Sequence, residues 1–79
     1  MDITAAEKKA LLKALGKRLE ELIYARYKNK EQFLAATGFY KANLHEIITG
    51  KVDPQYITLC RLSRALGVTV EELVKDTGK

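Results

Sequence analysis

The chain has 79 residues and is 47% hydrophobic, which is enough for one small core and too little for two domains. Its single cysteine and single histidine exclude a disulfide framework and a four-ligand zinc site within one chain. The sequence also lacks a phosphate-binding loop, a pair of outward carboxylates and a nucleophile beside a base. We therefore expect a protein that is not an enzyme and that needs no metal or cofactor.

The net charge of +4 suits a polyanionic partner. Residues 26–51 hold five basic and two acidic side chains and net +3. Residues 1–25 net +1 (five basic, four acidic), and residues 52–79 net zero (four of each). The middle third is therefore either a polyanion-binding region or a merely solvated face. Without a secretory signal or an apolar run of roughly 20 residues, we expect a cytoplasmic protein with no membrane partner.

Helical periodicity begins near the N-terminus. Thr4 and Glu7 form a capping box, and apolar residues follow at spacings of three and four: Leu11, Leu15, Leu19, Leu22 and Ile23. This pattern predicts a first helix from about Ala5 to Tyr27. Gly16 within it lowers helix propensity by up to about 1 kcal/mol relative to Ala, which indicates a close contact with another helix or a slight break.

The next two predicted helices meet at a tight corner. Asn29 is a capping residue that begins the second helix, and Gly38 ends it. Only Phe39 separates Gly38 from the next periodic segment, which suits two helices meeting at a steep angle. The sequence therefore predicts a helix-turn-helix whose third helix runs from about Tyr40 to Thr49.

This third helix has two distinct sides at 100° per residue. Leu44, Ile47 and Ile48 form the inward side. The opposite side carries Lys41, Ala42, His45, Glu46 and Thr49.

Two further helices complete the predicted fold. Gly50 ends the third helix, and Asp53 with Pro54 are the expected N-cap and first residue of the fourth. Its inward residues are expected to be Tyr56, Leu59, Leu62, Ser63 and Leu66. Gly67 ends this helix, and a capping box of Thr69 and Glu72 begins the fifth. We also expect Tyr24, Tyr27 and Tyr56 to lie at core edges and residues 76–79 to be a frayed tail.

Over about Leu15 to Val74 the chain resembles the lambda-repressor/Cro-like helix-turn-helix family, also called the xenobiotic-response-element type. The matching features are the Leu15-Gly16-Lys17-Arg18-Leu19 segment, Phe33, Gly38, Leu44, Ile47, Gly50, Pro54, Leu59, Leu62 and the Arg64–Leu73 segment. The resemblance implies an all-α, compact five-helix domain spanning residues 1–79, with residues 1–14 as a helical N-terminal extension. It also implies that the third helix enters the major groove of double-stranded DNA and that a symmetric homodimer reads two half-sites.

The resemblance further assigns individual residues by position. Base-reading side chains would be Lys41, Ala42 and His45, although an exposed Lys or His is otherwise simply solvated. Phosphate contacts would come from Lys30, Asn43, Thr49 and Lys51. Tyr40 would either cap the core or reach a phosphate with its hydroxyl.

Five positions depart from the family pattern, and four of them lie where the third helix is supported. Ile23 and Ile48 stand where the family usually has a paired Arg and Glu, so we expect these two isoleucines to pack directly. Leu34 replaces an Ala at the helix crossing, and Tyr40 replaces a Ser or Thr N-cap. Lys30 replaces the usual Gln at the start of the second helix.

These features predict a transcriptional regulator, most simply a repressor or controller that occupies a palindromic operator as a homodimer. The alternative is a protein-interaction module, or an antitoxin that binds a toxin, with the same fold. Modest charge, an outward Glu46 and the altered corner motivate that alternative.

Overall fold

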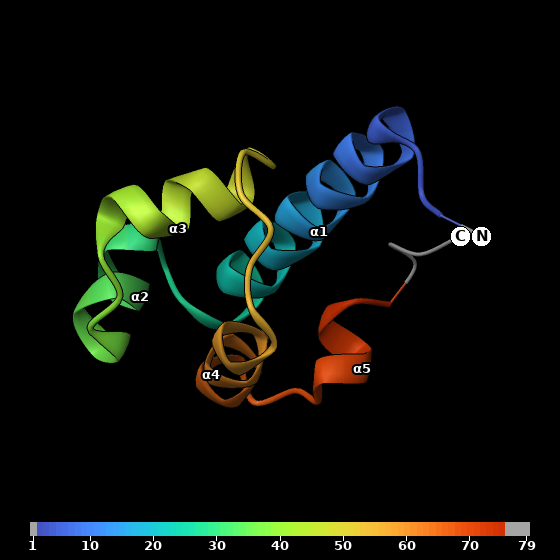
Figure 1. Cartoon of the computed structure of the whole chain (residues 1–79). Helices are drawn as coiled ribbons and strands as arrows, with labels where there is room; N and C mark the ends of the chain where they lie inside the picture. Colours follow the sequence, from blue (N-terminus) through green and yellow to red (C-terminus); the bar gives the residue numbers. More distant parts are fainter. Residues whose placement is uncertain (1, 76–79) are drawn as a thin grey trace.

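The computed structural model describes residues 2–75 and contains five α-helices in that range (Figure 1). Their bounds are α1 Ala5–Arg26, α2 Lys30–Thr37, α3 Lys41–Ile48, α4 Tyr56–Leu66 and α5 Val70–Leu73. No strand occurs in this part of the chain. The predicted all-α, five-helix architecture is confirmed, whereas the predicted tail at residues 76–79 lies outside the described residues.

The other four helices are arranged around α1, which contacts each of them. Figure 1 shows α3 on one side of α1 and α5 on the other. Every helix contributes to the buried core of the described residues, which contains Leu15, Leu19, Ile23, Phe33, Leu44, Ile47, Leu62, Leu66 and Leu73. These are positions that the helical spacing placed inward, so the periodicity of the sequence identified the core.

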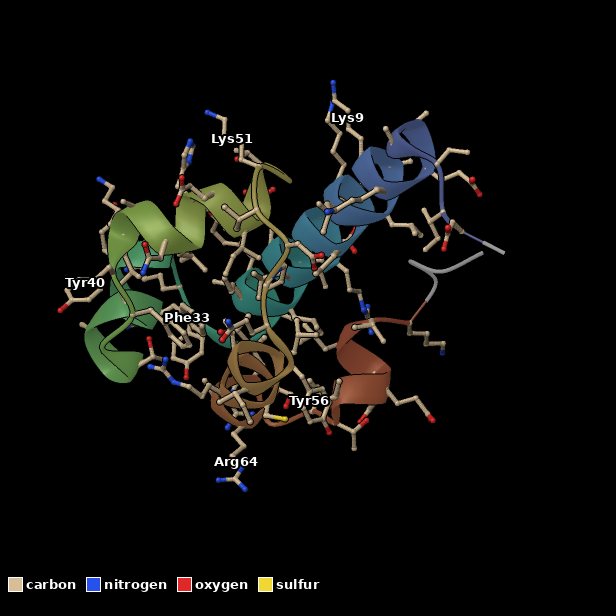
Figure 2. All side chains as sticks on the ribbon, viewed as in Figure 1. Lys9, Phe33, Tyr40, Lys51, Tyr56 and Arg64 are labelled. Carbon is tan, nitrogen blue, oxygen red and sulfur yellow. The ribbon has the colours of Figure 1, made fainter. Side chains whose placement is uncertain are left out.

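Phe33 is the aromatic centre of this core and is fully buried between α2 and α4 (Figure 2). The edge of the Tyr27 ring meets it at a centroid distance of 5.1 Å, and the Phe39 ring stacks parallel to it at 6.1 Å. Each aromatic pair adds about 0.5–1.5 kcal/mol beyond the burial of its area. The Tyr27 hydroxyl also donates a hydrogen bond of 2.9 Å to the carbonyl of Ala65. The segments on both sides of α2 are thereby fixed to the core.

The predicted start signals of three helices are confirmed. Thr4, Asn29 and Thr69 each accept a hydrogen bond from the backbone N–H three residues later, at 3.1, 2.8 and 3.0 Å respectively. Gly38 and Gly67 end α2 and α4 in the left-handed region, at φ 78° and 70°. Local sequence chemistry therefore sets these boundaries.

The predicted start of the fourth helix is wrong. Asp53 is not its N-cap, because α4 begins at Tyr56 after an extended Gln55 with ψ 157°, and no side chain caps it. Val52 packs against the core, and the Asp53 carboxylate lies 3.8 Å from the Nζ of Lys8 on α1. The packing of Val52 ties this segment to the core, and the segment stays extended past Pro54 until α4 begins.

Two of the three tyrosines predicted at core edges are instead exposed. Tyr56 is the first residue of α4 and is 67% exposed. Tyr24 is 53% exposed because it lies 100° around α1 from the buried Ile23, outside the apolar arc. Only Tyr27 takes the expected place.

Both isoleucines that replace the usual ion pair belong to the core region. Ile23 is fully buried on α1, and Ile48 at the end of α3 is half-buried and packs against the same cluster. Two apolar side chains in this region avoid the desolvation cost of an ion pair. Direct packing between them stays a prediction.

Candidate nucleic-acid interface

The outward side of α3 is accessible over its whole length. Lys41, Ala42, Asn43, His45 and Glu46 are exposed, whereas Leu44 and Ile47 on the opposite side are buried. The predicted division of this helix into an inward and an outward side is therefore confirmed. The helix is short and one side is fixed in the core, so the exposed side chains project from a rigid support.

The corner between α2 and α3 is fixed by aromatic packing. Gly38 turns the chain at φ 78°, and the Phe39 ring then stacks on Phe33. The Arg61 guanidinium lies over the Phe39 ring, 4.4 Å from its centroid. Tyr40 follows as the N-cap of α3, with extended backbone and no side-chain capping hydrogen bond. Its side chain is 76% exposed, so its hydroxyl is free of the core.

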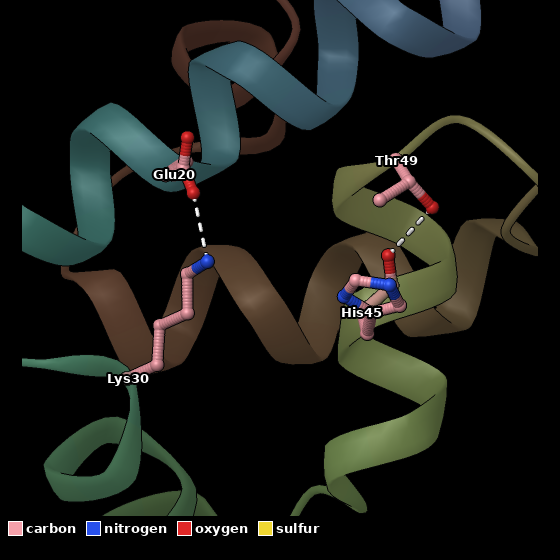
Figure 3. Close-up of polar contacts among 4 residues, drawn as sticks. All are labelled: Glu20, Lys30, His45 and Thr49. Atoms are coloured by element: carbon pink, nitrogen blue, oxygen red, sulfur yellow. Dashed lines mark hydrogen bonds and ion pairs between the residues drawn. The ribbon is translucent and has the colours of Figure 1, made fainter.

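The C-terminal end of α3 is closed by backbone hydrogen bonds. The Lys51 N–H donates to the Glu46 carbonyl at 2.9 Å, around Gly50 at φ 75°. The Thr49 hydroxyl donates to the His45 carbonyl at 2.8 Å, and the Thr49 N–H donates to the same oxygen (Figure 3). Both donors of Thr49 are therefore already engaged, whereas the Lys51 ammonium is exposed.

Lys30 begins α2 but is tied to α1. Its Nζ lies 2.8 Å from Oε2 of Glu20, and both side chains remain more than one third exposed (Figure 3). The hydrogen bond to Glu20 raises the pKa of Lys30 above its ordinary value. An ammonium group has three donors, so Lys30 keeps the capacity to bind an anion. The pair as a whole carries no net charge, which reduces its attraction for a phosphate.

Several of the predicted site residues border one hollow between α2 and α3. Lys30, Lys41 and His45 line it together with Leu34, the residue that stands where the family usually has Ala. Asn43 lies on the other flank of α3 and borders a second hollow, together with Pro54 from the segment that leads into α4. The structure thus brings Lys30 close to Lys41 and His45 on α3 and separates Asn43 from them.

Three lysines near this surface were not identified from the sequence. Lys8, Lys9 and Lys13 on α1 border a hollow that also includes Thr49 and Lys51. Their spacing on the predicted first helix indicates that Lys9 and Lys13 share one side of it. Only the crossing of α1 and α3 shows that this side lies beside Thr49 and Lys51.

Within residues 2–75, no three His, Cys, Asp or Glu side chains are grouped so as to hold a metal ion. No helix in this range combines the length and the apolar character needed to cross a membrane.

A sequence model of the Cro/C1-type HTH DNA-binding domain matches residues 18–79. Comparison with curated proteins gives no match, and comparison with solved structures gives none either. The match covers most of the chain and leaves residues 1–17 outside it, including the N-terminal extension predicted at residues 1–14. The helix-turn-helix, its exposed third helix and this match agree: the chain belongs to the Cro/C1-type helix-turn-helix family of DNA-binding domains.

Proposed function

We propose that this DNA-binding protein regulates transcription by occupying a palindromic operator as a homodimer, most simply as a repressor or controller. The observation that carries the proposal is the exposed side of α3, opposite a buried side anchored in the core. Such a helix fits the major groove, which is wide enough to admit one α-helix. A homodimer would place two such helices in half-sites about one helical turn apart.

Three side chains on α3 are proposed to read bases. Lys41, at the first position of the helix, has the donors to recognise O6 and N7 of guanine. The methyl group of Ala42 suits an apolar contact with a thymine methyl, and His45 can donate to an acceptor on a base edge or to a phosphate. All three are exposed, and Lys41 and His45 border the same hollow.

The proposed phosphate contacts differ in how readily each is made. Lys51 and Asn43 are exposed, and the Tyr40 hydroxyl projects from a side chain that is 76% exposed. Lys30 would bind phosphate as part of its pair with Glu20. Thr49 would contribute only after its hydroxyl leaves the His45 carbonyl. Such contacts fix the position of the protein on the duplex and carry no sequence information.

A selection from random duplexes with the whole chain tests this proposal. We expect an enriched motif with two-fold symmetry and half-sites about one helical turn apart. Enrichment of a single, non-symmetric half-site would contradict the homodimer. Failure to enrich any sequence would contradict specific DNA recognition altogether.

A protein-interaction module, or an antitoxin that binds a toxin, is the second candidate. It is supported by Glu46 on the outward side of α3 and by Glu20, which offsets the charge of Lys30. The salt dependence of DNA binding separates the two functions. Regulation through phosphate contacts requires the affinity to fall steeply between about 50 and 200 mM salt, whereas a flat response would favour the protein partner.

A further inference from the structure

The first turns of α1 are capped at their N-terminus and lie outside the family match. The match starts at residue 18, whereas α1 starts at Ala5. The capping box closes this end in both directions: the Glu7 N–H donates to Thr4 Oγ1, and the Thr4 N–H donates to Glu7 Oε1, each at 3.1 Å. We call residues 5–14 of this helix the extension.

The extension lies directly against the chain that follows α3. A Cβ atom added to Gly50 would lie 3.0 Å from both the backbone nitrogen and Cγ of Lys13, and 3.2 Å from the carbonyl carbon of Leu12. Contact at this distance leaves no room for a side chain between the two segments. The lysines of the extension are therefore held beside the C-terminal end of the proposed recognition helix.

A basic groove of about 570 Å³ lies between the extension and residues 49–51. Its lining includes Lys8, Lys9, Lys13 and Lys51, and no carboxylate is among the lining residues. Figure 2 shows Lys9 and Lys51 projecting from the same side of the molecule, with Arg64 on the opposite side. Lys8 alone has a nearby acid, Asp53 at 3.8 Å, and this pair is too exposed to hold the ammonium firmly.

This grouping of positive charge is electrostatically unfavourable in the free protein. Lys9 and Lys13 stand four residues apart on one helix, where like charges repel and destabilise it. Lys51 adds a further positive charge across the groove. The phosphates of a nucleic acid would attract these lysines and offset the repulsion between them, and the binding would release counterions from the nucleic acid.

We propose that the extension is a second phosphate-binding element, in which Lys9 and Lys13 join Lys51 in holding the DNA backbone next to the recognition helix. The inference rests on the proposed function, because it requires α3 to lie on the same duplex. The extension would add affinity without adding sequence preference, since phosphate contacts do not distinguish bases.

The test compares two variants that each lose two positive charges. K9Q/K13Q removes the charges of the extension, and R64Q/K75Q removes two exposed charges of α4 and the segment after α5. Affinity for the selected duplex is measured between about 50 and 200 mM KCl. Because a homodimer carrying K9Q/K13Q would lose four phosphate contacts, we expect the slope of log affinity against log salt to be shallower by about 3.6, which makes the fall in affinity over this range roughly 150-fold smaller. R64Q/K75Q should keep the slope of the unmodified protein, K9R/K13R should restore it, and the selected motif should not change.

The outcomes separate this inference from the proposed function. If K9Q/K13Q and R64Q/K75Q show the same slope while K41A loses sequence preference, the extension is no phosphate-binding element and the proposed function stands. If the unmodified protein selects no duplex, both are overturned. Thermal unfolding followed by circular dichroism shows whether K9Q/K13Q retains its helix. If it does not, the single variants K9Q and K13Q replace it, and each should make the slope shallower by half as much.

Discussion

Gly16 of α1 lies directly against the backbone carbonyl of Ile48, the last residue of α3. A Cβ atom at position 16 would overlap this carbonyl group and would also come within 2.8 Å of the Ile47 carbonyl oxygen. The two helices therefore meet backbone to backbone, which explains why a residue of low helix propensity stands in the middle of α1. The sequence pattern left open a close contact or a break at Gly16, and the contact is confirmed.

Gly16→Ala is expected to destabilise the protein by about 1–3 kcal/mol, because the added methyl group has no space and α1 and α3 must separate. Helix propensity alone would give the opposite sign, a gain of up to about 1 kcal/mol. The free energy of unfolding, measured by denaturant unfolding, decides between these two expected changes. Lys17→Ala, at the next and exposed position, is the control and should change the stability by less than about 0.5 kcal/mol. A Gly16→Ala variant more stable than the unmodified protein would show that the helices do not meet here.

Ile48→Glu is expected to lower the free energy of unfolding by about 1–3 kcal/mol, because a carboxylate would replace an apolar side chain packed against the core. Ile57→Glu is the matched control, since Ile57 is 66% exposed and its replacement should cost less than about 0.5 kcal/mol. Equal effects of the two changes in thermal unfolding would contradict the place of Ile48 in the core.

The capping box of the extension gives a pH dependence. The hydrogen bond from the Thr4 backbone, with a second from its side chain, lowers the pKa of Glu7 below its ordinary value of 4.5. A lowered pKa in the folded state means that the carboxylate stabilises the helix end above pH 4.5 and that this stabilisation is lost as the pH falls through the folded pKa. An NMR titration of the Glu7 amide should show a midpoint below 4.5, and Glu7→Gln should remove the titration while keeping an acceptor for the cap. A midpoint at or above 4.5 would mean that the box does not form.

Glu20→Gln is expected to strengthen DNA binding, because it frees the Lys30 ammonium from its 2.8 Å pair. If Lys30 of each protomer then neutralises one phosphate, the slope of log affinity against log salt becomes steeper by about 1.8 for the homodimer. Glu21→Gln removes a neighbouring exposed carboxylate of α1 and controls for the change in overall charge. A Glu21→Gln effect as large as that of Glu20→Gln would show that Lys30 does not reach the DNA.

Features that depend on neighbouring residues in the sequence could be predicted. Thr4, Asn29 and Thr69 bond only three residues ahead, so their residue types alone predict the helix starts. The burial of Leu44 and Ile47 likewise follows from a 3.6-residue period. These local rules identified the helix-turn-helix, the core and the exposed side of α3.

Features that depend on contacts between distant segments could not be predicted from the sequence. Asp53 and Pro54 resemble a helix start, but Val52 packs against the core and Asp53 turns toward Lys8. The pairing of Lys30 with Glu20 required the angle between α1 and α2, which spacing does not give. The basic groove was missed for the same reason, because its lysines come from segments more than 35 residues apart.

Base reading by α3 is tested most directly by Lys41→Ala on the duplex obtained by selection. The affinity of this variant for that duplex should fall by about 1–3 kcal/mol for each half-site, roughly 5- to 150-fold per half-site, and its preference should relax at one position in each half-site. Arg64→Ala, which removes one charge from the opposite side of the molecule, should leave affinity and preference unchanged. A Lys41→Ala variant that keeps both the affinity and the sequence preference of the unmodified protein would contradict the assignment of Lys41 to base reading.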